Sequence, residues 1–270
     1  MGAGTNHIVL ENQGSGGHLV LDLSRSFSAQ PTNLFYPGPP EGQLGFDRFV
    51  APPPVEAAHC FTPGTLIDTP RGPRPVETLA AGDAVLTIDH GFQPIQWIAR
   101  RQVTDLGGRN AHLRPIRIAA GALGPGVPQV DLTVSPQHRI LIRSRVAQAL
   151  FGTSEILSAA KHLVAMPGIE VVEEAAEVTY IHMLLRRHEL VHSNGAVTET
   201  MYPGPEALKA YGPAARARIM HLAGMDNPDK HLPKARLTPR GGQVRSLAQL
   251  HLRDHLPLVL PQPVPALAGS

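Results

Sequence analysis

One cysteine and one serine–histidine pair are the residues of this chain best suited to covalent chemistry. Cys60 is the only cysteine among 270 residues, so it cannot form a disulfide within the chain, and its thiol serves either packing or reaction. A thiol that attacks a peptide carbonyl needs a base, and the departing nitrogen needs a proton donor. Ser135 and His138 lie three residues apart, around the turn-forming Pro136. A hydroxyl and an imidazole on one turn could grip the two ends of a peptide bond, but an ordinary capped turn has the same sequence.

A second motif offers different chemistry. Residues 188–192 read His-Glu-Leu-Val-His, the pattern with which helical metallopeptidases bind zinc. That chemistry needs both histidines on one helix face, the glutamate as base and a third ligand. The third position of the longer signature is Thr198, and the downstream glutamates are the nearby Glu199 and Glu206. The Asn-Gly pair at 194–195 predicts a strand and hairpin turn instead of a helix. A zinc peptidase is therefore the least favoured of three hypotheses, of which the other two are given at the end of this subsection. No metal or cofactor is expected.

Short strands must position these residues. From about residue 60 to 203, β-branched runs alternate with Gly, Pro and Asp turns, which is typical of an all-β domain. The main expected strands lie at 66–67, 84–88, 95–98, 116–118, 132–134, 139–142 and 178–181. Two helical interludes are expected, a single turn at 76–79 and a helix at 154–163. Each is followed by an extended segment. This weak internal repeat suits a pseudo-symmetric β-fold.

The segments on either side of this domain differ from it in composition and in expected secondary structure. Residues 1–57 are expected to form an N-terminal segment with short strands at 7–10 and 18–21 and a Pro-rich linker at 37–54. A helical and irregular tail is expected over 204–270, with helices at 206–211, 214–222 and 244–252. The expected domain between them spans 58–203.

Composition excludes several function classes. The 27 prolines and 26 glycines favour short elements joined by turns. A net charge of +2 without a basic block predicts no nucleic-acid partner. No stretch is apolar over the 18 or so residues of a membrane span, and the start lacks the basic and apolar regions of a secretory signal. Oligomeric state stays open, as does the compartment, which is the cytoplasm or the exterior reached without a cleavable signal.

Three blocks of the sequence resemble those of Hint domains, the module of Hedgehog proteins and inteins. The first is 60–65 together with 75–86, the second is the Ser-x-x-His segment at 134–139, and the third runs from 178–182 to 188–195. The resemblance covers roughly residues 58–203 and is greatest to a bacterial subgroup of Hint-domain-containing proteins. It implies an all-β, horseshoe-like, pseudo-two-fold Hint fold with short helices.

The resemblance also implies autoprocessing. Cys60 would attack the carbonyl of His59 and convert the His59–Cys60 peptide bond to a thioester. His138 would donate a proton to the leaving nitrogen, and Ser135 would polarise or twist the amide. His182 or, as the lesser candidate, His188 would assist from the closing strand.

The substrate in that reaction would be the chain's own N-terminal segment, residues 1–59. Splicing is not expected, because Asn194 precedes Gly195 in a hairpin turn and no His-Asn pair follows. Sterol transfer is not expected either, because Arg100 stands in the stretch where Hedgehog proteins carry an aspartate. Water or a small thiol is the expected acyl acceptor. The second hypothesis is a catalytically inactive Hint fold, structural or export-associated, with Cys60 buried and inert.

Overall fold

The computed structural model divides the chain into two units, one ending at Pro52 and the other beginning at Pro53. It describes residues 7–11, 18–22, 59–209, 211–225, 227 and 232–260. In the first unit, β1 (His7–Glu11) and β2 (His18–Asp22) pair as an antiparallel hairpin, which confirms the two strands expected there. The expected Pro-rich linker and the end of the tail lie outside the described residues.

Short strands dominate the second unit, as the alternation of β-branched runs and turns predicts. They are β3 (Leu66–Thr69), β4 (Gly72–Pro75), β5 (Ala84–Thr87), β6 (Gly91–Pro94), β7 (Trp97–Val103), β8 (Ile116–Ile118), β9 (Leu132–Val134), β10 (Arg139–Arg143), β11 (Glu155–Ala159), β12 (Ile169–Val171), β13 (Val178–Leu184), β14 (Leu190–Ser193) and β15 (Ala196–Glu199). The helices are α1 (Arg145–Phe151), α2 (Pro205–Lys209), α3 (Pro213–Leu222) and α4 (Gly241–Arg253), with 3-10 turns η1 (Val76–Thr78), η2 (Ala111–Leu113) and η3 (Ala160–His162). The all-β class with short helices and a helical tail is confirmed.

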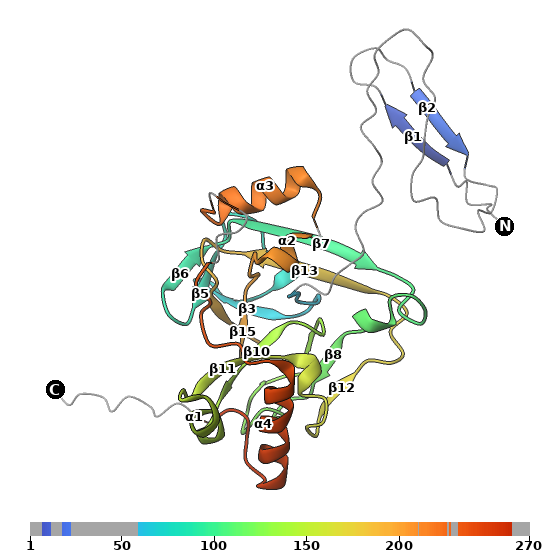
Figure 1. Cartoon of the computed structure of the whole chain (residues 1–270). Coiled ribbons are helices and arrows are strands. Elements are labelled where there is room, and N and C mark those ends of the chain that lie inside the picture. The colour runs from blue at the N-terminus through green and yellow to red at the C-terminus, as the bar shows by residue number, and fades with distance from the viewer. Residues whose placement is uncertain are drawn as a thin grey trace. The chain divides into compact units, whose positions relative to one another are not determined.

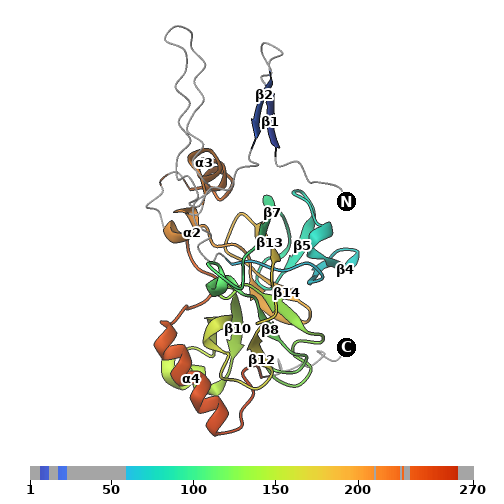
Figure 2. The ribbon, with the colours of Figure 1, turned by 90° about the vertical axis from the view of Figure 1, so that its right-hand side faces the viewer.

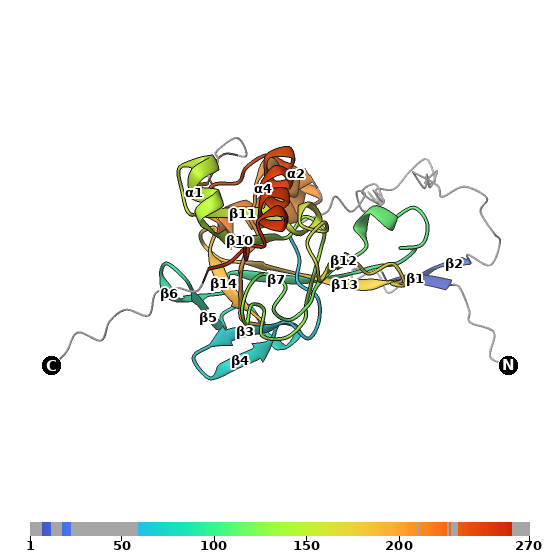
Figure 3. The ribbon, with the colours of Figure 1, turned by 90° about the horizontal axis from the view of Figure 1, so that it is seen from below.

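The strands of this unit form three sheets. The largest has the order β11-β10-β15-β14-β3-β4, and β5 pairs with both β14 and β6. The second has the order β12-β8-β9, and the third is the two-stranded ribbon of β13 and β7. Figure 3 shows β3 and β4 at one side of the domain and α1 and α4 at the other. Both helices contact β11, beside which they lie in Figure 1.

The β7–β13 ribbon sets the face on which the site is built. The two strands pair along their whole length, from Trp97 opposite Leu184 to Val103 opposite Val178. Residues opposite each other in an antiparallel pair point to the same face. His182 therefore shares a face with its partner Ala99, and it lies in the middle of the buried stretch 180–184 of β13.

The segment 154–163 corrects one prediction. The helix expected there is wrong: residues 155–159 form β11, and only the last turn, η3, is helical. β11 pairs with β10 over its full length, and Ile156 to Ala159 are buried in succession. Burial on both sides of a strand removes the alternation that separates a strand from a helix in sequence.

The internal repeat differs from the expected one, which was a helical turn followed by an extended segment in each half. In one half β4 leads directly into η1, and in the other β11 leads directly into η3. Each half also contributes one of the two seven-residue strands, β7 and β13, that pair with each other. The repeated unit is therefore a strand followed by a 3-10 turn, consistent with a pseudo-two-fold fold.

The hairpin at 194–195 confirms the turn prediction. Asn194 and Gly195 join β14 to β15 with φ values of 51° and 82°, as a two-residue turn with both φ positive requires. The Asn194 side chain accepts from Leu66 N–H and donates to the Asp131 carbonyl, both at 2.7 Å. Its amide is thus used to hold neighbouring loops together.

The helical tail packs on two different parts of the domain (Figure 2). Leu208 and Ile219, from α2 and α3, are buried against Leu184 at the end of β13. Leu247 of α4 is buried in the core of β8 to β11 instead, with Ile140. None of the helices in the described part of the chain is long and apolar enough to cross a membrane.

Candidate active site

Cys60 and Phe61 lie between the end of β9 and the middle of β13. The backbone N–H and carbonyl of Phe61 exchange two hydrogen bonds of 2.9 Å with Ile181, and Phe61 also bridges to Val134. The Cys60 carbonyl accepts from the backbone N–H of Ser135 at 3.0 Å. This short extended segment brings together three parts of the chain that are far apart in sequence.

The peptide nitrogen of Cys60 is hydrogen-bonded to the side chain of Ser135. The Cys60 N–H donates to the hydroxyl oxygen at 3.0 Å, in surroundings where Ser135 is almost fully buried. The turn that follows β9 holds this hydroxyl in place, because the His138 N–H donates to the Ser135 carbonyl at 3.0 Å. The Ser-x-x-His segment is thus folded as a turn against the His59–Cys60 bond.

The thiol of Cys60 contacts His182. Its sulfur lies 3.3 Å from Nε2 and 3.5 Å from Nδ1 of that ring. The sulfur is therefore almost equally close to both ring nitrogens. The thiol is 2% exposed and packs with Val103, Leu106 and Tyr180.

Burial keeps this pair neutral. It raises the pKa of the Cys60 thiol well above its usual range, although a hydrogen bond from Ser135 and the charge of Arg101 oppose that rise. Burial also lowers the pKa of His182 to about 4, helped by the nearby His59 and Arg101. Near pH 7 the site therefore holds a thiol and a neutral imidazole, not a thiolate–imidazolium pair.

His138 is buried beside the same segment without a well-formed hydrogen bond. Neither ring nitrogen has a partner of good geometry among the described residues, although the Cys60 backbone is near enough to raise its pKa slightly. Burial has the larger effect and lowers that pKa to about 4. The ring packs edge-on against Phe61, with centroids 4.6 Å apart. Unpaired buried polar atoms are rare and often mark functional positions.

His188, the lesser candidate for the assisting role, lies in a different network. Its Nε2 donates to Glu199 at 2.9 Å, and its Nδ1 accepts from the Ala235 N–H at 3.1 Å. These partners fix the neutral tautomer with the proton on Nε2. His182, and not His188, is the histidine that contacts the thiol.

Glu199 is a site residue that sequence reasoning considered only as a zinc ligand. It lies at the end of β15 with a side chain that is 0% exposed, and its Oε1 is 3.6 Å from Nε2 of His59. Arg139, which follows His138, pairs with it at 3.0 Å. The signal available in the sequence was a single carboxylate in the otherwise uncharged run 196–202, and a charged residue is rarely buried unless its charge is paired.

A family model described as Hint domain matches residues 59–205, which is more than half of the chain. This chain belongs to the Hint-domain family. The matched region begins one residue before Cys60 and contains every residue of the site described above except Ala235. Membership supports a self-processing domain in general.

Several solved structures are similar to this Hint domain at low sequence identity. The gp41-1 intein shares 13% identity with a TM-score of 0.31, covering 52% of this chain and 96% of its own. A bacterial intein-like domain from Clostridium thermocellum shares 15% with a TM-score of 0.33, covering 52% and 98%. The Ssp DnaB mini-intein variant M86 shares 8% with a TM-score of 0.33, covering 54% and 97%. A search of curated proteins found no match.

The metallopeptidase motif of this Hint domain is folded as a strand. Residues 190–193 form β14, and no group of three or more potential metal ligands occurs within the described ranges. His188 and Glu189 bind different partners, since Glu189 pairs with His90 at 2.9 Å. The helix that the zinc motif requires is absent from residues 188–192.

The arginine that influences the thiol is Arg101 and not Arg100. The guanidinium of Arg100 donates to the carbonyls of Glu77 and Leu79, at 2.7 and 3.0 Å. Arg101 is one residue further along β7 and therefore on the opposite face, and its charge lowers the pKa values of Cys60 and His182. A positive charge, and no carboxylate, thus comes from this strand to the site.

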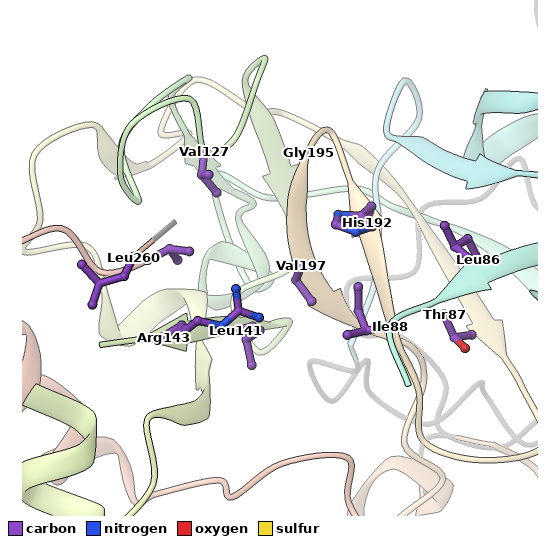
Figure 4. Close-up of a pocket in the computed structure, with 11 residues that line it drawn as sticks. Leu86, Thr87, Ile88, Val127, Leu141, Arg143, His192, Gly195, Val197 and Leu260 are labelled. Atoms are coloured by element: carbon purple, nitrogen blue, oxygen red, sulfur yellow. The ribbon is translucent and has the colours of Figure 1, made fainter. Parts of the chain in front are cut away.

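The domain also has a cavity of about 460 Å³ (Figure 4). Its lining comes from β5, β10, β14, β15 and the segment at 259–260, and includes Leu141, Arg143, His192 and Val197. None of Cys60, Ser135, His138 and His182 lines it. The buried thiol of Cys60 is therefore not part of the wall of this cavity.

Proposed function

We propose that this Hint domain cleaves its own chain at the His59–Cys60 peptide bond by an N–S acyl shift. The observation that supports this most is the position of Cys60 between two groups. Its amide N–H is bonded to the Ser135 hydroxyl at 3.0 Å, and its sulfur contacts His182 at 3.3 Å. Both ends of the reaction, nucleophile and leaving nitrogen, therefore have a partner.

In the first step, the sulfur of Cys60 attacks the carbonyl carbon of His59. The thiol proton passes to the neutral imidazole of His182 as the carbon–sulfur bond forms, because burial disfavours a free thiolate beforehand. The carbonyl becomes a tetrahedral oxyanion. The hydrogen bond from the peptide nitrogen to Ser135 holds the amide in place during the attack.

In the second step, the carbon–nitrogen bond breaks and the α-amine of Cys60 leaves. The proton that His182 took from the thiol passes to His138, on the same turn as Ser135, and the resulting imidazolium of His138 donates it to this nitrogen. The thiol proton thus ends on the amine, and the shift is an isomerisation without net change in protons. Residues 1–59 are then held as a thioester on Cys60.

Water or a small thiol completes the reaction by attacking the thioester. Water releases residues 1–59 as a carboxylic acid and returns the Cys60 thiol, whereas a thiol gives a new thioester of the same segment. Splicing is not proposed, because Asn194, with its amide engaged at Leu66 and Asp131, lies in a hairpin and not at a junction. The reaction is single-turnover and acts in cis.

Hydroxylamine capture tests this proposal. Full-length chain incubated with hydroxylamine should yield residues 1–59 carrying a C-terminal hydroxamate, together with residues 60–270. The Cys60→Ser chain gives an ester in place of a thioester and should yield the hydroxamate much more slowly. Absence of the hydroxamate from the native chain after prolonged incubation would exclude a thioester at Cys60.

A second candidate function is a Hint fold that serves as a structural or export-associated module without reaction. The burial of Cys60 among Val103, Leu106 and Tyr180, with its pKa raised, favours this candidate. Thiol accessibility separates the two. A Cys60 that resists a small alkylating reagent in the folded chain, together with an uncleaved chain, would support the inactive module.

A further inference from the structure

The side chain of His59 lies in an enclosed polar site on the acyl side of the proposed scissile bond. It is 10% exposed, and its Nε2 lies 3.6 Å from Oε1 of Glu199, whose side chain is 0% exposed. The proposed reaction does not use Glu199. A fully buried carboxylate is costly unless other groups compensate for its charge, so its presence beside His59 needs a reason.

The carboxylate of Glu199 has one acceptor position left. Its Oε1 accepts the backbone N–H of Arg139 at 2.8 Å. Its Oε2 accepts from the Arg139 guanidinium at 3.0 Å and from Nε2 of His188 at 2.9 Å. A carboxylate offers about four lone-pair positions. The remaining one belongs to Oε1, the oxygen nearest to the His59 ring.

The charge of Glu199 is already balanced. Arg139 supplies one positive charge, and His188 is neutral because its Nδ1 accepts a backbone N–H from Ala235. Burial lowers the pKa of His59 to about 3, so the His59 ring is neutral as well. A carboxylate at position 59 would face Glu199 without compensation, and a cation would leave an excess positive charge.

We infer that Glu199, held by Arg139 and His188, forms a subsite that selects a neutral side chain with an N–H near its remaining acceptor position, the imidazole of His59, as the residue whose carbonyl Cys60 attacks. This inference rests on the proposed function and adds a substrate preference to it. Glu199 is a positioning residue, because it acts through His59. Fixing that side chain fixes the adjoining carbonyl relative to the sulfur of the next residue.

Rates of cleavage for a series of residues at position 59 test the subsite. Full-length His59→Gln, His59→Glu and His59→Lys chains would be followed by the first-order appearance of residues 60–270 in hydroxylamine. The glutamine variant keeps a neutral donor and should be slowed less than about tenfold, whereas the two charged variants should be slowed more than about 100-fold. Similar rates for all three would overturn the inference.

A compensating change in Glu199 distinguishes recognition from a purely structural role. The Glu199→Gln amide can donate to a carboxylate, so the His59→Glu/Glu199→Gln chain should cleave at least about tenfold faster than His59→Glu alone. A purely structural role would slow every position-59 variant by the same factor, and that result would overturn the inference. If Glu199→Gln does not fold, the position-59 series decides alone.

A stability measurement separates failure of the subsite from failure of the reaction. In a Cys60→Ala chain, which cannot react, His59→Glu should lower Tm by at least about 4 °C more than His59→Gln. If His59→Glu lowers Tm more than His59→Gln but the native chain is not cleaved, the reaction is refuted and the subsite stands. If the native chain is cleaved but the two variants do not differ in rate or in Tm, the subsite is refuted and the reaction stands.

Discussion

At the residue scale, burial determines the state of the reacting groups. Cys60 and His182 are in contact, yet the pKa of the thiol is raised and that of the imidazole is lowered. A thiolate–imidazolium pair is therefore not the resting state, so in the proposed reaction proton transfer must accompany the attack on His59. This arrangement suits a reaction that occurs once per chain, for which a permanently activated nucleophile is not needed.

The hydroxyl of Ser135 gives the first residue-scale prediction. Ser135→Ala leaves the buried N–H of Cys60 without an acceptor, and we expect N-terminal cleavage to slow by about tenfold or more. Ser135→Thr is the matched control, because it keeps a hydroxyl at the same atom and should retain more of the rate. Rates come from gel densitometry of the two fragments. An alanine variant that cleaves faster than the threonine variant would contradict the assigned role.

His182 gives the second prediction. His182→Ala removes the group in contact with the thiol, so thioester formation should fall by about 100-fold or more, as expected for loss of a general base. His192→Ala is the control, since His192 lies on β14 and lines the cavity shown in Figure 4. Hydroxylamine-dependent cleavage measures both. Equal losses in the two variants would show that the histidine at the thiol has no special part.

The lowered histidine pKa values predict a stability that falls with acid. His59, His138 and His182 have folded-state pKa values of about 3, 4 and 4, below the value of 6.5 expected when unfolded. As pH falls below 6.5 the unfolded chain binds protons first, so the free energy of unfolding decreases and keeps decreasing down to about pH 4. Between pH 6.5 and 4.5 each ring contributes a loss of about 2 kcal/mol.

Urea unfolding of the Cys60→Ala chain at several pH values checks this dependence. Burial also lowers the pKa of His162 and His251, which adds to the loss in the same direction. Restricting the range to pH above 4.5 largely separates the histidines from Glu199, whose pKa is lowered and whose contribution is lost in stronger acid. A constant or rising stability between pH 6.5 and 4.5 would contradict the burial of these rings in neutral form.

At the element scale, sequence patterns predicted the strands better than the helices of the domain. The strands at 116–118 and 132–134 were predicted with the bounds they have, because β-branched residues there lie between clear turn residues. The helix expected at 154–163 is wrong, because β11 is buried on both faces and lacks a two-residue period. Local pattern cannot report which partner strand a segment finds.

The site shows the same limit. Cys60, Ser135, His138 and His182 could be proposed from the resemblance, and the structure brings the first, second and fourth into contact. The pairing of Glu199 with His59 could not be proposed, because it depends on β15 and the start of the domain meeting across 140 residues of chain. Such contacts follow from topology and not from spacing.

Helix α4 gives the prediction at this scale. Leu247 is fully buried in the core with Ile140, so Leu247→Ala should reduce the free energy of unfolding by about 2–5 kcal/mol. Leu252, on the same helix, is 42% exposed, so Leu252→Ala should change the free energy of unfolding by less than about 1 kcal/mol. Denaturant unfolding of the two variants provides the comparison. Similar losses in both would mean that α4 does not dock by the Leu247 face.

At the scale of the whole molecule, the proposed reaction would make this chain both the substrate and the domain that acts on it. Residues 1–59 precede the nucleophile directly, the Hint domain follows, and the tail adds helices to two of its faces. α2 and α3 extend the core at the end of the β7–β13 ribbon, whereas α4 completes the core of β8 to β11 (Figure 2). The tail is thus part of the folded domain, and truncation after residue 205 should destabilise it.

The central claim is that Cys60 breaks the bond on its own N-terminal side. Intact-mass measurement of purified full-length chain, over time and with a small thiol present, tests it most directly. We expect two species that sum to the whole chain, residues 1–59 and 60–270, and only the unbroken mass from the Cys60→Ala chain. A native chain that stays unbroken, or a Cys60→Ala chain that fragments at the same bond, would contradict the claim.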